Sequence, residues 1–239
     1  HSTMIGGRVL ARAGKPVFFG SPSSLPEDAI RSLQLEANVA PAQFSVPCGG
    51  RPINARVMRF LNQTITLEEV VRMQPQGGSL HADLDADLLK VAVFDRHDRS
   101  GRVALGFVQG FGARVGADGT TVNLDENTLL VAGARDEDMA LCANALIDCG
   151  GGVAVVEDGT ILEKQDFPVG GVFCLDPWQG VGKRLERLHR LLREKGSPFT
   201  KPIFALAFLT FVTLPALRIT DRGLVRVKER KIVPLWDEL

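Results

Sequence analysis

Between residues 87 and 133 the apolar positions form short continuous runs separated by turn residues. The segment from Leu88 to Phe94 is almost entirely apolar, which is typical of a strand covered on both faces of its sheet. Residues 102–108 predict a second strand after a turn at residues 97–101, and residues 129–132 predict a third. These runs indicate the centre of a buried sheet.

Two other segments show the spacing of amphipathic helices. In residues 136–148 the apolar side chains recur at i, i+3, i+4, i+7 and i+8, so they share one face of a helix. Acidic residues in the first turn suit the positive end of the helix dipole, and Gly150 can form a left-handed C-terminal cap. Residues 179–195 predict a second helix, which Gly196-Ser197-Pro198 ends.

Turn residues predict two hairpins in the same part of the chain. Residues 153–162 turn at Asp158-Gly159, because this pair suits the positive φ angles of a tight two-residue turn. Residues 218–227 form the second hairpin, with a turn at Asp221-Arg222-Gly223. The apolar segment 203–217 is shorter than the ~20 residues that a membrane helix needs, so we expect a buried element there.

The first seventy residues show shorter and weaker patterns. Residues 8–11 and 17–19 predict two strands joined by a turn, and residues 21–24 predict a loop. Alternation over residues 55–61 predicts a further strand. Thr66 is expected to cap a short helix over residues 67–73.

Together these elements predict an α+β protein with two regions. Residues 1–70 are expected to form an N-terminal β segment, a remnant resembling a β-sandwich, in which residues 1–3 are left over from a tag. Residues 71–239 are expected to form a mixed α/β domain with two main helices packed on a sheet.

Composition and net charge indicate which classes of binding partner are unexpected. Of the 239 residues, 45% are hydrophobic and 23% are charged, and Lys plus Arg equals Asp plus Glu. Zero net charge argues against nucleic acid or an anionic membrane as a partner, because such binders carry a strongly basic surface. Four cysteines at irregular spacing, without a CxxC pair, indicate reduced thiols and a cytoplasmic protein.

The histidines offer few candidates for chemistry. His189 lies on the basic face of the second predicted helix and is expected to be solvated. His81 precedes three aspartates that resemble the start of a calcium loop, but the sixth position lacks glycine and the twelfth lacks glutamate. His97 lies at a strand end, where functional residues are often found, although its spacing equally fits a turn histidine without a site role.

Several blocks of the chain resemble one known family. They lie at residues 87–97, 106–112, 136–152, 167–171 and 217–225, and their order and spacing match over most of the chain. On these blocks the chain resembles the C-terminal region of the adenine deaminases, members of the amidohydrolase superfamily. That family converts adenine and water to hypoxanthine and ammonia, with manganese or iron held in an upstream barrel by a His-x-His pair and further ligands. This chain has no His-x-His, so the resemblance implies that the metal site lies outside it.

Two turns depart from the family's pattern. Where the family has Ala-His-Asp-Ser-His-Asn, this chain has Asn123-Leu124-Asp125-Glu126-Asn127-Thr128, so Leu124 and Asn127 replace both histidines. The family's Pro-Ile-Ala-Gly block is Pro168-Val169-Gly170-Gly171 here. These changes argue against standard adenine deaminase activity in this chain.

The resemblance supplies the site candidates. His97 and Asp125 are the catalytic candidates, no metal ligand or other cofactor is expected in this chain, and four residues are candidates for ligand binding. These four are Asp136, Phe167, Gly170 and Gly171.

Three hypotheses about function remain open. The first is the C-terminal part of an adenine-deaminase-like hydrolase of purine metabolism, which acts on a cyclic amidine, needs an amidohydrolase barrel in cis or in trans, and is inactive alone. The second is a stand-alone, non-catalytic module that binds a purine or mediates oligomerisation. The third is an independent enzyme with a site near His97. A homo-oligomer is expected, and neither nucleic acid nor a membrane is expected as a partner.

Overall fold

The computed structural model describes residues 1–18, 25–30, 32–33, 35, 38–98, 100–124 and 126–237. Its centre is an eight-stranded sheet with the strand order β13-β12-β10-β11-β8-β9-β5-β6. Neighbouring strands are antiparallel except β5 and β9, which run parallel, so the sheet is mixed. Its strands are β5 (Ile53–Phe60), β6 (Thr66–Met73), β8 (Leu88–Phe94), β9 (Val103–Gln109), β10 (Ala117–Thr120), β11 (Leu129–Gly133), β12 (Gly152–Glu157) and β13 (Thr160–Asp166).

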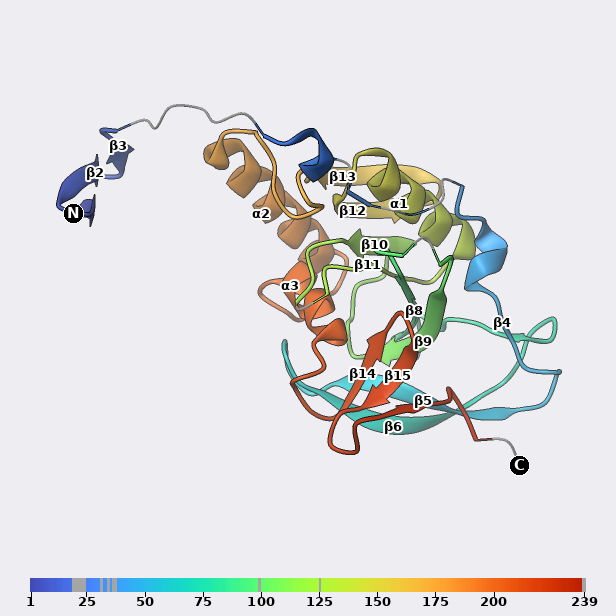
Figure 1. The fold of residues 1–239 in the computed structure, drawn as a ribbon. Coiled ribbons are helices and arrows are strands. Elements are labelled where there is room, and N and C mark those ends of the chain that lie inside the picture. Colours follow the sequence, from blue (N-terminus) through green and yellow to red (C-terminus); the bar gives the residue numbers. More distant parts are fainter. Residues whose placement is uncertain are drawn as a thin grey trace.

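Helices cover both faces of this sheet (Figure 1). Helix α1 (Asp136–Asp148) packs on one face, and helices α2 (Trp178–Glu194) and α3 (Pro202–Ala207) pack on the other. Strand β8 shows the consequence, because Val91 belongs to the core beneath α2 while the next residue, Ala92, belongs to the core beneath α1. All seven residues of β8 are buried, which explains why six of them are apolar.

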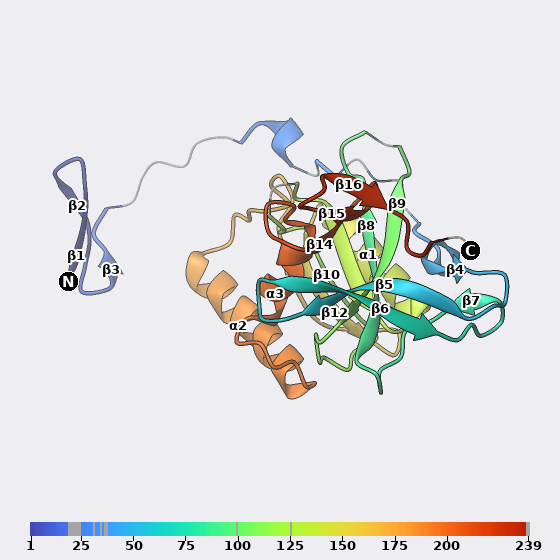
Figure 2. The same ribbon diagram turned by 90° about the horizontal axis from the view of Figure 1, so that it is seen from below.

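Three smaller sheets surround the central one. The C-terminal sheet packs on the same face as α2 and α3, and its residues Ile219 and Leu224 enter that core. The N-terminal sheet lies away from the central sheet in both views (Figures 1 and 2). The remaining strands are β1 (Ser2–Ile5), β2 (Arg8–Arg12), β3 (Lys15–Pro16), β4 (Val46–Pro47), β7 (Ser79–Leu80), β14 (Leu217–Thr220), β15 (Gly223–Arg226) and β16 (Lys231–Val233), and the 3-10 turns are η1 (Glu27–Ala29), η2 (Pro41–Phe44) and η3 (Phe208–Thr210).

The expected α+β class is confirmed, and the longest predicted elements fall at the expected places. Strand β8 and helix α1 have the predicted bounds, and both predicted hairpins form, as β12–β13 and β14–β15. The loop expected at residues 21–24 lies outside the described residues. In the part of the chain that is described, no helix combines the length and the apolar character needed to cross a membrane.

The short helix expected over residues 67–73 is wrong. These residues belong to β6, which pairs along its whole length with β5. Leu67, Val70 and Val71 have the i, i+3, i+4 spacing of a helix, but two adjacent valines favour a strand once a partner strand is present. Residue 70, the expected end of the N-terminal region, lies inside β6, and β5 and β6 belong to the central sheet.

The expectation that His189 on α2 is solvated is also wrong. Only 9% of the residue is exposed, and its Nδ1 has no hydrogen-bond partner among the described residues. Burial, together with the positive charges of Lys201 and Arg193, lowers the pKa of His189 to about 4. The histidine is therefore neutral at physiological pH.

Because His189 is buried in its neutral form, we expect the free energy of unfolding to fall at acid pH. The folded pKa of about 4 lies below the ordinary value of 6.5, so the stability present above pH 6.5 is lost as the pH falls toward 4. Between pH 7 and pH 4.5, we expect the free energy of unfolding to fall by about 2 kcal/mol less in His189→Gln than in the parent protein. Urea denaturation at pH 7 and pH 4.5 measures the effect, and exposed His81 provides the matched control His81→Gln. Equal pH dependence in the two variants would contradict the prediction.

Candidate functional site

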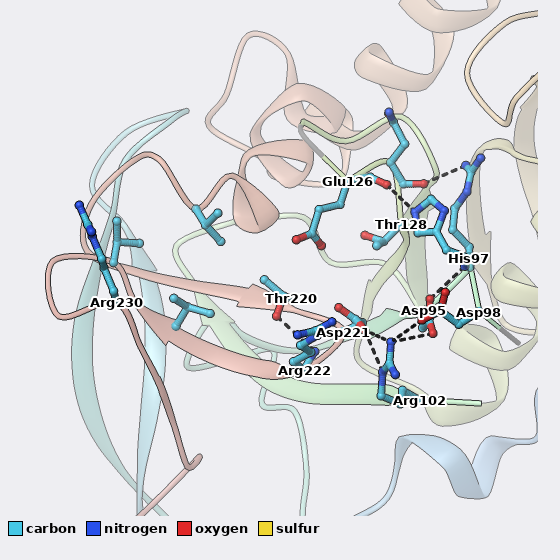
Figure 3. A pocket seen from close by; sticks show the side chains of 15 residues that line it. Asp95, His97, Asp98, Arg102, Glu126, Thr128, Thr220, Asp221, Arg222 and Arg230 are labelled. Atoms are coloured by element: carbon cyan, nitrogen blue, oxygen red, sulfur yellow. Dashed lines mark hydrogen bonds and ion pairs between the residues drawn. The ribbon is translucent and has the colours of Figure 1, made fainter. Parts of the chain in front are cut away.

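A cavity of about 800 Å³ opens beside the end of β8 (Figure 3). Three chain segments form it: the turn after β8, the loop before β11, and the C-terminal hairpin β14–β15 with residues before and after it. The lining residues are Asp95, Arg96, His97, Asp98, Arg102, Glu126, Asn127, Thr128, Val212, Thr220, Asp221, Arg222, Val225, Val227 and Arg230. Charged groups of both signs therefore surround the cavity.

Arg102 joins two of these segments. Its guanidinium lies 2.9 Å from Asp95 Oδ2 and 3.0 Å from Asp221 Oδ2. Dashed lines in Figure 3 mark these contacts. Burial alone would raise the pKa of Asp95, but hydrogen bonds from Ser100 and the His97 backbone, together with the charge of Arg102, hold it below its usual range. Asp95 is therefore ionised and anchors the turn.

His97 bridges the turn after β8 and the loop before β11. Its backbone N–H donates to Asp95 Oδ1 at 2.9 Å, and its ring Nε2 lies 3.1 Å from the carbonyl oxygen of Glu126. Because a carbonyl oxygen only accepts, this contact requires a proton on Nε2, and in the neutral imidazole Nδ1 is then an acceptor. The residue is exposed at the cavity, so this acceptor can reach a ligand.

Arg96 connects the cavity with the turn at Gly170 and Gly171. Only 6% of Arg96 is exposed, and it donates to the carbonyl oxygens of Asn127 at 2.8 Å and Gly170 at 2.7 Å. Burial lowers the pKa of its guanidinium. Gly171 has a φ of +74°, and a Cβ there would lie 2.5 Å from Arg96 Nη1. Both the backbone angle and the space require glycine at this position.

The structure separates the remaining predicted site residues. Phe167 is buried in the core beneath α2. Asp136 begins α1 on the opposite face of the sheet and pairs with Lys90 at 2.5 Å. Neither residue lines the cavity. Asp125 lies outside the described residues, although its neighbour Glu126 lines the cavity. Roles for these residues in catalysis or ligand binding stay predictions.

Sequence reasoning missed Arg102 and Asp221 as site residues. They are 119 positions apart, and each lies at a turn or strand end with no motif around it. The only signal was their position at the borders of predicted hairpins, which does not reveal that the two turns meet.

The described residues do not fit the metal centre that the family resemblance implies. Among them, no three His, Cys, Asp or Glu side chains are grouped so that they could hold a metal ion. The cavity contributes one histidine, and Asp95 and Asp221 are both engaged by Arg102. No step of a reaction is therefore assigned to a metal in this chain.

Comparison with known proteins identifies the family. The model for the adenine deaminase C-terminal domain matches residues 63–231. The chain belongs to this family. An adenine deaminase of Clostridium botulinum (strain Langeland) is 34% identical over 237 residues, which cover 98% of this chain and 40% of the relative.

Two further relatives give the same result. An adenine deaminase of Moorella thermoacetica is 36% identical over 97% of this chain and 39% of its own length. An adenine deaminase of Brucella abortus (strain 2308) is 39% identical over 71% of this chain and 29% of its own length. The chain thus spans about 40% of the length of the first relatives it matches, in agreement with a C-terminal domain.

The loop that departs from the family's pattern forms one wall of the cavity. Asn127, at one of the two histidine positions, lines the cavity with a φ of +46°. Leu124, at the other, is not among the residues that line the cavity, and its carbonyl oxygen accepts a hydrogen bond from Thr210. Hydrogen bonds to backbone carbonyl groups therefore hold this loop, because Asn127 accepts from Arg96 and Leu124 accepts from Thr210.

Proposed function

We propose that this chain is the C-terminal part of an adenine-deaminase-like hydrolase and works with an amidohydrolase barrel supplied in cis or in trans. The observation that carries the proposal is that nearly the whole chain matches about 40% of each adenine deaminase. The reaction of the complete protein would be the conversion of adenine and water to hypoxanthine and ammonia. The expected cytoplasmic setting of purine metabolism is part of this proposal.

The chemistry of deamination supports a division of labour between the two parts. A divalent metal lowers the pKa of a bound water molecule, which supplies hydroxide at neutral pH to attack the purine ring. The described residues of this chain supply no group of three metal ligands, whereas the cavity supplies hydrogen-bonding groups at His97, Glu126 and Arg222. We infer that the barrel would hold the metal and that His97 would face the purine or the residues that bind it.

The isolated chain is expected to turn over no adenine and to hold no stoichiometric manganese, iron or zinc. Ammonia release with adenine as substrate measures activity, and elemental analysis of the purified chain measures metal. The full-length Moorella thermoacetica relative, assayed under the same conditions, is the positive control. Adenine turnover by the isolated chain together with a tightly bound metal would contradict the proposal.

A non-catalytic purine-binding module is the second candidate, and the cavity favours it. About 800 Å³ can hold a nucleobase, and His97 Nδ1 offers an acceptor at the rim. In this case adenine or hypoxanthine would raise the melting temperature of the isolated chain, and exposed His97→Ala would reduce the shift without unfolding the protein. A flat response to both nucleobases would remove this candidate and leave the first in place.

A further inference from the structure

Strand β6 is a free edge of the central sheet. It is the last strand in the order, and in Figure 1 it forms the lower border of the molecule. Val70 at its middle is 65% exposed, and Leu67 is 38% exposed. Apart from the contact of Ala216 with Thr66, no described segment pairs with the outer side of β6. An exposed eight-residue edge is a ready template for another strand.

The register shows which backbone groups point outward. In the β5–β6 hairpin the Leu61 N–H donates to the Ile65 carbonyl at 2.9 Å, so Leu61 and Ile65 form a hydrogen-bonded pair. Such pairs alternate along an antiparallel ladder, so every second residue of β6 turns its N–H and C=O away from β5. Thr66 confirms the alternation, because its carbonyl oxygen accepts from Ala216 outside the ladder at 3.1 Å. Glu68, Val70 and Arg72 therefore offer backbone groups at the free edge.

Antiparallel self-pairing would bring the charges along this edge into complementary positions. With Val70 opposite Val70 of a second copy, Glu68 of each copy lies opposite Arg72 of the other. Glu68 is ionised, because its hydrogen bond with Arg226 lowers its pKa. Arg72 has no carboxylate partner within the described part of the chain, although its side chain is exposed. Opposite charges directly across two strands stabilise the pairing.

We propose that β6 is a homodimer interface in which two copies of this chain pair antiparallel about a two-fold axis at Val70. The two central sheets then become one continuous sheet, which removes the free edge. The outward N–H and C=O groups of Glu68, Val70 and Arg72 form the ladder between the copies. The other edge strand, β13, differs from β6 because it packs against α2, and its Glu163 pairs with Arg187 of that helix.

A cysteine at the two-fold axis gives a direct test. In a hydrogen-bonded antiparallel pair the two Cα atoms lie about 5.5 Å apart, which suits a disulfide. Under mild oxidation Val70→Cys is expected to form a covalent dimer in high yield. Leu67→Cys is the matched control on the same strand, because in this register it lies about 20 Å from its own copy. The parent chain controls for the four native cysteines.

A charge at the two-fold axis gives the second test. Val70→Lys places two lysines opposite each other and is expected to weaken dimerisation at least about tenfold in analytical ultracentrifugation. Ile161→Lys, at a similarly apolar exposed position on β13, is expected to leave the dimer intact. A monomeric parent chain, or equal cross-linking of the Val70 and Leu67 variants, would overturn the proposal. Either result would favour the alternative that another part of a longer protein pairs with β6.

Discussion

Replacing Asp136 with asparagine is expected to lower the free energy of unfolding by about 3 kcal/mol. Asp136 accepts a hydrogen bond from Lys90 Nζ, and only 1% of the Lys90 side chain is exposed. The second acceptor of this ammonium group is the carbonyl oxygen of Phe44 at 3.0 Å. Loss of the carboxylate would leave a buried positive charge without a counter-charge, which is among the most destabilising changes in a protein core.

Urea denaturation at pH 7 measures this effect, and the neighbouring residue supplies its control. Glu137 is exposed in the same first turn of α1, so Glu137→Gln removes the same charge from the helix dipole without breaking a buried pair. We expect that control to cost less than about 1 kcal/mol. If the two variants were equally stable, Asp136 would have no structural role, and its predicted role in ligand binding would gain support.

Replacing Asp118 with leucine is expected to raise the free energy of unfolding by about 2 kcal/mol at pH 7. Asp118 lies in β10, is 1% exposed, and neither carboxylate oxygen has a hydrogen-bond partner among the described residues. Burial raises its pKa well above the ordinary value of 3.8. Leucine has the same branching as aspartate and suits the surrounding aliphatic core, which includes Val155 on the neighbouring strand.

The pH dependence distinguishes this explanation from a simple packing effect. Because the folded pKa of Asp118 is raised, its contribution to stability is complete below pH 3.8 and is lost as the pH rises. The advantage of Asp118→Leu should therefore grow from pH 4 to pH 8. Asp138 is the control, because it is also buried but accepts hydrogen bonds from the backbone of Asp158 and Gly159. Asp138→Leu should destabilise the protein, and a destabilising Asp118→Leu would contradict the prediction.

These two aspartates also show how far the sequence could predict the site. Asp136 was a ligand-binding candidate because it lies in a block that resembles the adenine deaminases, yet its partner Lys90 is 46 positions away in a strand predicted as almost entirely apolar. Lys90 interrupts that run, but one lysine does not disturb a pattern of six apolar residues. His97 was predicted from its place at a strand end, and the structure does place it at the cavity.

Elements whose own residues specify them were predicted at the correct positions. Strand β8 has a run of apolar residues, and helix α1 has apolar residues at helical spacing. The β12–β13 hairpin turns at Asp158-Gly159, a pair that suits a tight two-residue turn. Family membership also follows from residue identities along the chain. These features are determined by the sequence because neighbours in the chain suffice to produce them.

The tertiary structure alone decided the features that depend on distant partners. Residues 67–73 became a strand because β5 lies beside them, and His189 became buried because the segment around Lys201 folds back over α2. Arg102 meets Asp221 across 119 positions, and together they define the cavity. Burial, pairing and pKa are properties of the groups that surround a side chain, and only the fold brings those groups together.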